Sequence, residues 1–311
     1  MVKTLNYIAE DKEAEKMLNI VKNKKIIYIV SAVLILASIV SMLIQGFKMD
    51  IDFAGGIECT VNVGAQVDSA KSSEIAKIVK DSAGVDATVQ KTGDAGTEAL
   101  IKISEEITTE KEVAMKDALV KGLGIEKEAI TNFEVVSPTV GKEMQTSAIL
   151  AVIIAVALML VYISLRFEFL SGCAAVVALI HDVLIMCGFY SIFQLPINTT
   201  FIAAILTILG YSINATIIIF DRVRENQKLT RKETFVNIVN TSVRQTLLRS
   251  LNTSITTLAT LIVLFFVGVD SIKEFALPIT VGVVAGFYSS VFVSGNIWAE
   301  FKKLAKHKNV A

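Results

Sequence analysis

The sequence predicts a polytopic α-helical membrane protein with six transmembrane helices and one extracytoplasmic α+β domain between the first two. Three observations predict this fold class. Hydrophobic residues make up 53% of the 311 residues, and the mean hydropathy is +0.61, a value that soluble domains rarely reach. Six apolar segments are long enough to cross about 30 Å of hydrocarbon. A single large polar region, residues 46–143, interrupts them.

Composition excludes several classes of function. The formal net charge is zero, which argues against a general binder of nucleic acid. The three cysteines, Cys59, Cys173 and Cys187, are odd in number, contain no C-x-x-C pair and imply no disulfide framework. With only two histidines, His181 and His307, a protein metal site is not expected, and no cofactor is predicted.

The first apolar segment follows a charged tail, residues 1–25. Residues 26–45 form a run that is too long for the core of a secretory signal and is not followed by a small-residue cleavage site. We therefore expect a retained first transmembrane helix.

The polar region, residues 46–143, reads as a compact domain. The strand patterns IECTVNV, VDATVQK, EALIKIS and ITNFEVV alternate with two amphipathic helices, SSEIAKIVKDSAG and TTEKEVAMKDALVKGLG. The order β-α-β-β-α-β is that of the ferredoxin-like split βαβ unit. It contains no catalytic constellation, so a domain that docks a partner or touches a substrate is expected.

Five further spans are expected within residues 144–299, at about 146–165, 170–193, 199–220, 247–269 and 275–299. A cytoplasmic amphipathic segment, residues 221–245, separates the fourth and fifth, and a basic tail, residues 300–311, ends the chain.

Orientation follows from the lysines and arginines that flank the spans. On one side lie Lys22, Lys24, Lys25, Arg166, Arg222, Arg224, Lys228, Arg231, Lys232, Arg244, Lys302, Lys303, Lys306 and Lys308. The opposite short connections hold one basic residue, Lys273. Both termini are therefore predicted to be cytoplasmic and the α+β domain to face outward.

Ionisable residues inside spans cost about 2.5 kcal/mol or more at mid-helix, so each one is a functional hypothesis. His181 and Asp182 stand near the middle of the third span, and Arg249 lies near the cytoplasmic end of the fifth. A buried Asp–His pair suits a proton relay. Two alternatives stay open: a structural Asp–His hydrogen bond, and an arginine that reaches the headgroups.

Small polar residues repeat at helical spacing on the fourth and fifth spans. Asn214 lies near Tyr211 on the fourth, and Asn252, Thr253 and Thr256 follow Arg249 on the fifth. Because such residues hydrogen-bond across helices, we expect a polar seam between the two spans. Helix–helix adhesion without a transport role is the alternative.

The end of the fourth span is marked by alternating charges. Asp221 and Arg222 begin the stretch DRVREN, which is typical of a solvated helix end that anchors the helix at the headgroups.

Several motifs together resemble the SecF family, the smaller subunit of the SecDF protein-export machinery and a relative of the RND transporters. The first is DFAGG, which contains Asp52, Phe53, Gly55 and Gly56 and directly follows the first span. The others are SPTVGKE, ALIHDVL, LTILGYSINATIIIFDRVREN and RQTLLRSLNTSITT. The resemblance covers nearly the whole chain and implies a bundle of half the RND size.

The resemblance implies a non-enzymatic role in protein export across the cell (cytoplasmic) membrane. It implies a SecD-like subunit, the SecYEG channel, YajC, the translocating preprotein and membrane lipids as partners. It also implies use of the proton-motive force, with Arg249 at the position of an arginine implicated in proton passage.

One position departs from the family pattern. The family commonly has an acid after the Asn of YSIN, and this chain has Ala215, which cannot titrate. Asp182 could supply the carboxylate instead, the SecD-like partner could carry it, or the subunit could be a scaffold. We favour the partner, because a shared interface needs only one acid.

Two other functions are less consistent with the sequence. An RND-like exporter of small molecules or lipids is the alternative, although that class has two large outer domains and about twice as many spans. A membrane enzyme has little support, because the sequence contains no H-E-x-x-H, G-x-S-x-G or paired intramembrane Asp motif.

Overall fold

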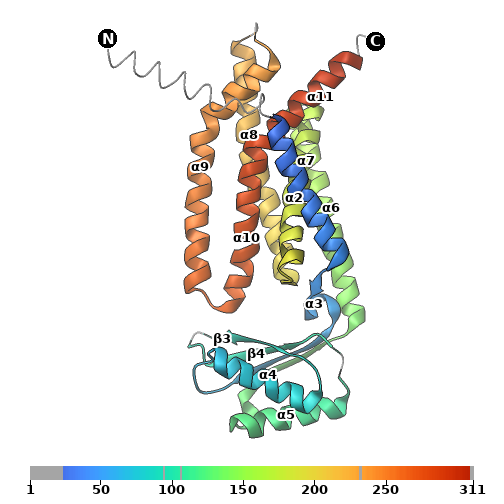
Figure 1. Ribbon diagram of the computed structural model, residues 1–311, viewed down its shortest axis with the longest axis vertical. Helices are drawn as coiled ribbons and strands as arrows, with labels where there is room; N and C mark the ends of the chain where they lie inside the picture. The colour runs from blue at the N-terminus through green and yellow to red at the C-terminus, as the bar shows by residue number, and fades with distance from the viewer. Residues whose placement is uncertain (1–23, 94, 106, 231–232, 309–311) are drawn as a thin grey trace, which may run out of the picture.

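The structure, a computed structural model, describes residues 24–93, 95–105, 107–230 and 233–308 (Figure 1). Most of the predicted N-terminal tail and the last three residues of the basic tail lie outside the described residues. Within these described residues, six helices are long and apolar enough to cross a membrane, as the sequence predicts. The chain is therefore a multi-pass membrane protein.

The first five of these helices are continuous, and the sixth is interrupted. Their bounds are α2 (Lys24–Ile44), α6 (Pro138–Arg166), α7 (Phe169–Ile192), α8 (Thr199–Leu229) and α9 (Phe235–Val267). The sixth comprises α10 (Asp270–Tyr288), a π-helical turn (Ser289–Ser294) and α11 (Gly295–Lys308). A π-helical turn holds an extra residue per turn and is frequent at functional sites.

The segment expected at residues 221–245 is formed by the ends of two helices. The helix α8 continues to Leu229, and α9 begins at Phe235. The buried side chain of Asn226 donates hydrogen bonds to Ser242 Oγ and Gln245 Oε1, both at 2.8 Å. These bonds tie the two helix ends together.

The α+β domain lies at one end of the bundle, and the start of α2 and the end of α11 lie at the other (Figure 1). Its strands are β2 (Gly56–Asn62), β3 (Thr88–Thr92), β4 (Glu98–Ile103) and β5 (Ile130–Val136), in the antiparallel order β3-β4-β2-β5. With α4 (Ser69–Ala83) and α5 (Thr109–Leu123), this is the predicted ferredoxin-like arrangement. A short 3₁₀ helix, Lys127–Ala129, precedes β5.

The core of this domain lies between the sheet and its two helices. Cys59 and Ile101 come from the sheet, and Ile75 and Met115 from α4 and α5; all four are fully buried. Burial raises the pKa of the Cys59 thiol to about 11, so this cysteine is a packed apolar residue at neutral pH.

A short connection joins the domain to the bundle. Strand β1 (Lys48–Met49) pairs in parallel with β6 (Pro196–Ile197), and α3 (Ile51–Ala54) follows. Asp50 caps α3 through the Ile51 N–H and also pairs with Lys102 of β4 at 2.9 Å. Because both charged groups are buried, this pair locks the connection onto the sheet.

The outer end of α10 also binds the domain. Asp270 accepts the Lys91 N–H at 3.0 Å, and Glu274 accepts the Gln90 side-chain amide at 2.5 Å. The second oxygen of Glu274 accepts from Asn198, the residue that caps α8, at 3.1 Å. One carboxylate thus contacts the domain and the bundle together.

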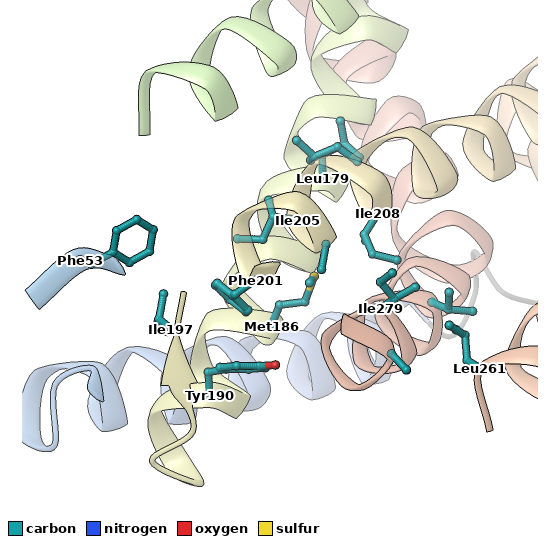
Figure 2. Packing of buried hydrophobic residues seen from close by; sticks show 14 residues of the cluster. Phe53, Leu179, Met186, Tyr190, Ile197, Phe201, Ile205, Ile208, Leu261 and Ile279 are labelled. Atoms are coloured by element: carbon teal, nitrogen blue, oxygen red, sulfur yellow. The ribbon is translucent and has the colours of Figure 1, made fainter. Parts of the chain in front are cut away.

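Apolar side chains fill the half of the bundle nearer the domain. Figure 2 shows Phe53 of α3 in the same cluster as Met186 and Tyr190 of α7 and Phe201 of α8. The rings of Tyr190 and Phe201 lie 4.3 Å apart between centroids, which fixes α7 against α8.

Candidate functional site

A buried carboxylate lies at the centre of the bundle. Asp182 of α7 is 0% exposed. Its Oδ2 atom accepts hydrogen bonds from Ser212 Oγ of α8 at 2.6 Å and from Ser289 Oγ of the π-helical turn at 2.8 Å. Its Oδ1 atom lies 3.1 Å from His181 Nδ1. Three transmembrane segments therefore meet at one side chain.

The local sequence explains how these segments come so close. Gly286 of α10 faces Ser212, where a Cβ atom would lie 3.1 Å from the serine Cβ. Gly188 of α7 faces Ser38 of α2, where a Cβ atom would lie 2.0 Å from the hydroxyl. Small residues permit this approach, and the π-helical turn then turns the Ser289 hydroxyl toward the carboxylate.

His181 extends the network toward the first transmembrane helix. Its ring stacks on Tyr288 with centroids 5.7 Å apart and an angle of 24° between the planes. The Tyr288 hydroxyl donates to the Ile27 carbonyl at 3.0 Å and lies 3.2 Å from Ser31 Oγ. Among the described residues, the Nε2 atom of His181 has no hydrogen-bond partner. We name the group of Asp182, His181, Ser212, Ser289 and Tyr288 the Asp182 network.

The polar residues predicted on the fourth and fifth spans lie elsewhere, and most of them are exposed on the chain's own surface. Asn214 of α8 and Arg249, Asn252, Thr253 and Thr256 of α9 are exposed. We name these five residues the open stripe.

The open stripe makes few contacts between helices. The hydroxyls of Thr253 and Thr256 donate to carbonyls of their own helix, at 3.1 Å and 3.0 Å for the contacts one turn back. Tyr211, half-buried beside the stripe, lies 3.1 Å from Ser254 Oγ and links α8 to α9. Among the described residues, no hydrogen bond connects Arg249 with Asp182.

Arg249 lies instead in a polar pocket at the end of the bundle away from the domain. The pocket has a volume of about 460 Å³, and Asp221, Arg222 and Gln245 also line it. Arg222 donates to Gln245 at 2.5 Å and to Glu225 at 2.6 Å. Asp221 lies 3.4 Å from an Arg166 nitrogen. The charged end of α8 is thus held by α9 and by the end of α6.

The DFAGG motif lies at the connection between bundle and domain. Asp52 accepts from the backbone N–H and the hydroxyl of Thr199, at 2.8 Å and 2.6 Å, and so holds the start of α8. Phe53 is buried in the apolar cluster of Figure 2. At Gly56, with φ +146°, a Cβ atom would lie 2.1 Å from the Ile103 carbonyl oxygen, so only glycine fits. Gly55 has φ +82°.

The sequence analysis named Asp182 and His181 as candidates but did not place Ser212, Ser289 or Tyr288 beside them. A signal for the serines exists, because the last span contains the stretch SSVFVSGN, which is unusually polar for a lipid-facing helix. A π-helical turn leaves no comparable pattern in the sequence. Within the described residues, no group of three or more His, Cys, Asp or Glu side chains could hold a metal ion.

Comparisons with known proteins give a consistent result. A family model described as "Protein export membrane protein SecD/SecF, C-terminal" matches residues 115–304. The protein translocase subunit SecF of Petrotoga mobilis is 36% identical, with 86% of this chain and 90% of the relative covered. The SecF of Haemophilus influenzae is 34% identical, with 88% and 82% covered.

Fused relatives are longer. The protein translocase subunit SecDF of Thermus thermophilus is 35% identical over 90% of this chain, which spans only 38% of that relative. A crystal structure of SecDF from the same organism, described as a translocon-associated membrane protein, superimposes with a TM-score of 0.77 at 31% identity. It covers 91% of this chain and 38% of that one.

Proposed function

The chain belongs to the SecD/SecF family of protein export membrane proteins, and from this premise we propose that it is a SecF-type accessory subunit of the Sec protein translocase. The coverage of 90% of a separately encoded SecF supports a SecF-type subunit. The relatives are named as translocase subunits, which are transport components rather than enzymes. No observation favours an RND-like exporter of small molecules or lipids.

The proposed location is the cell membrane, with both termini in the cytoplasm and the α+β domain outside. Two observations support it. The described ends of the chain lie together at the bundle end opposite the domain (Figure 1). Basic residues concentrate at that same end, as in cytoplasmic loops.

The proposed direct partner is a SecD-type subunit. In the fused relative, this chain corresponds to 38% of the length, which leaves room for a SecD-type part. The open stripe supplies a physical reason for a partner, since exposed arginine and amide groups are costly against lipid. The SecYEG channel, YajC, the preprotein and membrane lipids complete the proposed assembly.

The proposed energy source is the proton-motive force, with the titrating acid on the SecD-type partner. Ala215 of α8 cannot carry a proton. Asp182 stays a candidate together with His181, but its carboxylate is enclosed and already accepts two hydroxyls. Arg249 is exposed in a polar pocket, where a partner's acid can reach it. The exposure of the open stripe is the observation that carries this proposal.

Co-purification tests the proposed assembly. A tagged chain is expressed with the SecD-type protein of its own cell and isolated in mild detergent. We expect a complex with a fixed ratio of the two proteins. Replacing Asn252 and Thr256 with leucine should reduce its recovery, whereas Ile149→Leu, on an exposed apolar site of α6, should not. Isolation of the chain without any SecD-type protein would contradict the proposal.

A further inference from the structure

A polar cavity of about 400 Å³ lies apart from both sites described above. Its walls come from three segments that are distant in the sequence: the α6–α7 connection, the last turns of α8, and α11. The lining residues are Phe167, Glu168, Arg224, Gln227, Lys228 and Trp298. None of them belongs to the Asp182 network or the open stripe.

The cavity lies at the level of the membrane headgroups. From Thr199 to Phe220, α8 is about 33 Å long, close to the thickness of the hydrocarbon layer. The Phe220 ring packs on Trp298 at 4.6 Å between centroids. Arg224 follows one turn later and Lys228 after another, so this face of α8 changes from apolar to cationic at the cavity.

The cations in the cavity are not neutralised within the described chain. Lys228 is exposed and makes no ion pair with a described residue. Arg224 donates one bond to the Arg166 carbonyl at 3.2 Å, and its side chain is otherwise exposed. The single acid, Glu168, already pairs with Lys302 at 2.7 Å. The cavity therefore carries a net positive charge.

Trp298 provides a second, independent indication of a ligand. It is 1% exposed, and its indole N–H has no acceptor among the described residues. A buried donor without a partner is uncommon in folded proteins and calls for an explanation. Together with Phe167, the indole ring also forms an apolar wall beside the cations.

We propose that this cavity binds the phosphate of an anionic phospholipid headgroup. An arginine fork and a lysine suit a phosphate, and the indole N–H of Trp298 is a further donor without an acceptor among the described residues. The aromatic wall would contact the glycerol and the first methylenes. Free phosphate shares the charge chemistry, but the position at the headgroup level favours a membrane lipid.

Native mass spectrometry of the full chain tests the proposal. The protein is released from nanodiscs that contain phosphatidylglycerol and phosphatidylethanolamine, and the lipid retained per chain is counted. We expect one tightly held phosphatidylglycerol. The Arg224→Gln, Lys228→Gln double variant should retain it about tenfold less well, the scale expected for a lost charge-assisted hydrogen bond.

Two further variants separate specific binding from general charge. Lys25→Gln removes an exposed lysine at the same bundle end that does not line the cavity, and should not change retention. Trp298→Phe keeps an aromatic ring and both cations but removes the N–H donor, and it should also weaken retention of the lipid. This variant tests the proposal separately if the double variant folds poorly. Equal retention by the double variant and Lys25→Gln would overturn the proposal.

A parallel titration with inorganic phosphate identifies the source of the ligand. If millimolar phosphate alone displaces the lipid completely, the cavity is a phosphate site and the lipid proposal is wrong. The proposal depends on the membrane placement of the bundle and not on a role in export. Its failure would therefore leave the proposed Sec function unchanged.

Discussion

Two groups of polar residues lie in the same bundle and differ in their exposure. The Asp182 network is enclosed, and its carboxylate accepts hydroxyl groups from α8 and from the π-helical turn. The open stripe is exposed, and its two threonine hydroxyls bind the backbone of their own helix. The carboxylate of the first group is satisfied within the described chain, whereas the second group presents exposed polar side chains.

This difference separates what the chain does for itself from what it offers to a partner. In a lipid environment, each polar group must find a partner inside the protein or in another subunit. The Asp182 network meets that requirement by joining α7, α8 and α10. Exposed groups of the open stripe, such as Arg249 and Asn252, are available to another subunit, and we therefore propose that ion coupling takes place at a shared interface.

The largest effect on stability is expected from the buried ion pair at the domain connection, a third enclosed polar group. Lys102→Met would leave the Asp50 carboxylate buried without its counter-ion and should cost about 3 kcal/mol. The free energy of unfolding of the chain, measured in mixed micelles, checks this. A change below about 0.5 kcal/mol, the scale of an exposed pair, would show that the connection is open to water.

The pH dependence of the same pair has a defined sign. Burial is the largest single influence and lowers the pKa of Lys102, but the charge and hydrogen bond of Asp50 together with the charges of Glu274 and Glu58 outweigh it, so the pKa is raised above its usual 10.5. The stabilisation is therefore complete below pH 10.5, the value of the unfolded chain, and is lost as the pH rises through the folded value. In the Lys102→Met variant, the unfolding free energy should decrease less at alkaline pH than in the wild type.

Asp182→Ala should come next. The change leaves the hydroxyls of Ser212 and Ser289 without their acceptor and opens space among three helices. We expect a loss of about 2 kcal/mol in mixed micelles, near the upper range for hydrogen bonds between membrane helices. Asp182→Asn, which keeps the shape and an acceptor oxygen, should cost less. Equal losses for Ala and Asn would mean that the charge, not the packing, holds the helices.

Ser289→Ala should have a smaller effect. It removes one of the two hydroxyls on the Asp182 carboxylate but leaves Ser212 in place. The expected cost is about 0.6 kcal/mol, the average for such a bond between membrane helices. Ser290→Ala, in the same turn, is the matched control, since its hydroxyl bonds only the Phe287 carbonyl. If Ser290→Ala lowers the unfolding free energy as much as Ser289→Ala, the contact of Ser289 with the carboxylate has no special role.

The smallest effect on the isolated chain is expected in the open stripe. Thr256→Val keeps the side-chain shape and loses only hydroxyl bonds to the backbone of α9. Its unfolding free energy should change by less than about 0.5 kcal/mol, as for other surface substitutions. A loss above about 1 kcal/mol would mean that the stripe already packs within the chain.

Much of the fold follows from sequence pattern alone. The six spans are long and predominantly apolar, and the ferredoxin-like order follows from strand alternation and from two amphipathic helix patterns that end at glycine. The polar seam was harder to predict, because helical spacing shows that residues share a face but not what that face meets. Helical spacing puts Arg249 and Thr256 on one side of the helix, but it does not show that both side chains are exposed. That exposure is seen only in the structure.

The Asp182 network also shows what periodicity misses. Ser289 lies 107 positions from Asp182, and a π-helical turn brings it into contact. No regular spacing predicts such a turn, because it results from the packing of α10 against α7 and α8. Asp182 could be singled out from the sequence because a mid-span carboxyl is rare enough to stand out alone.

The most direct test of the account uses inverted membrane vesicles that contain this chain with its SecD-type partner. The completion of preprotein translocation that depends on the proton-motive force is compared for wild type, Asp182→Asn and Arg249→Met at equal expression. We predict that Arg249→Met loses the force-dependent step, because the acid that we propose on the partner would lack its arginine, and that Asp182→Asn largely retains it. If Asp182→Asn abolishes the step while remaining folded, the proton passes through this chain and the account is wrong; if neither variant is impaired, the chain is a scaffold.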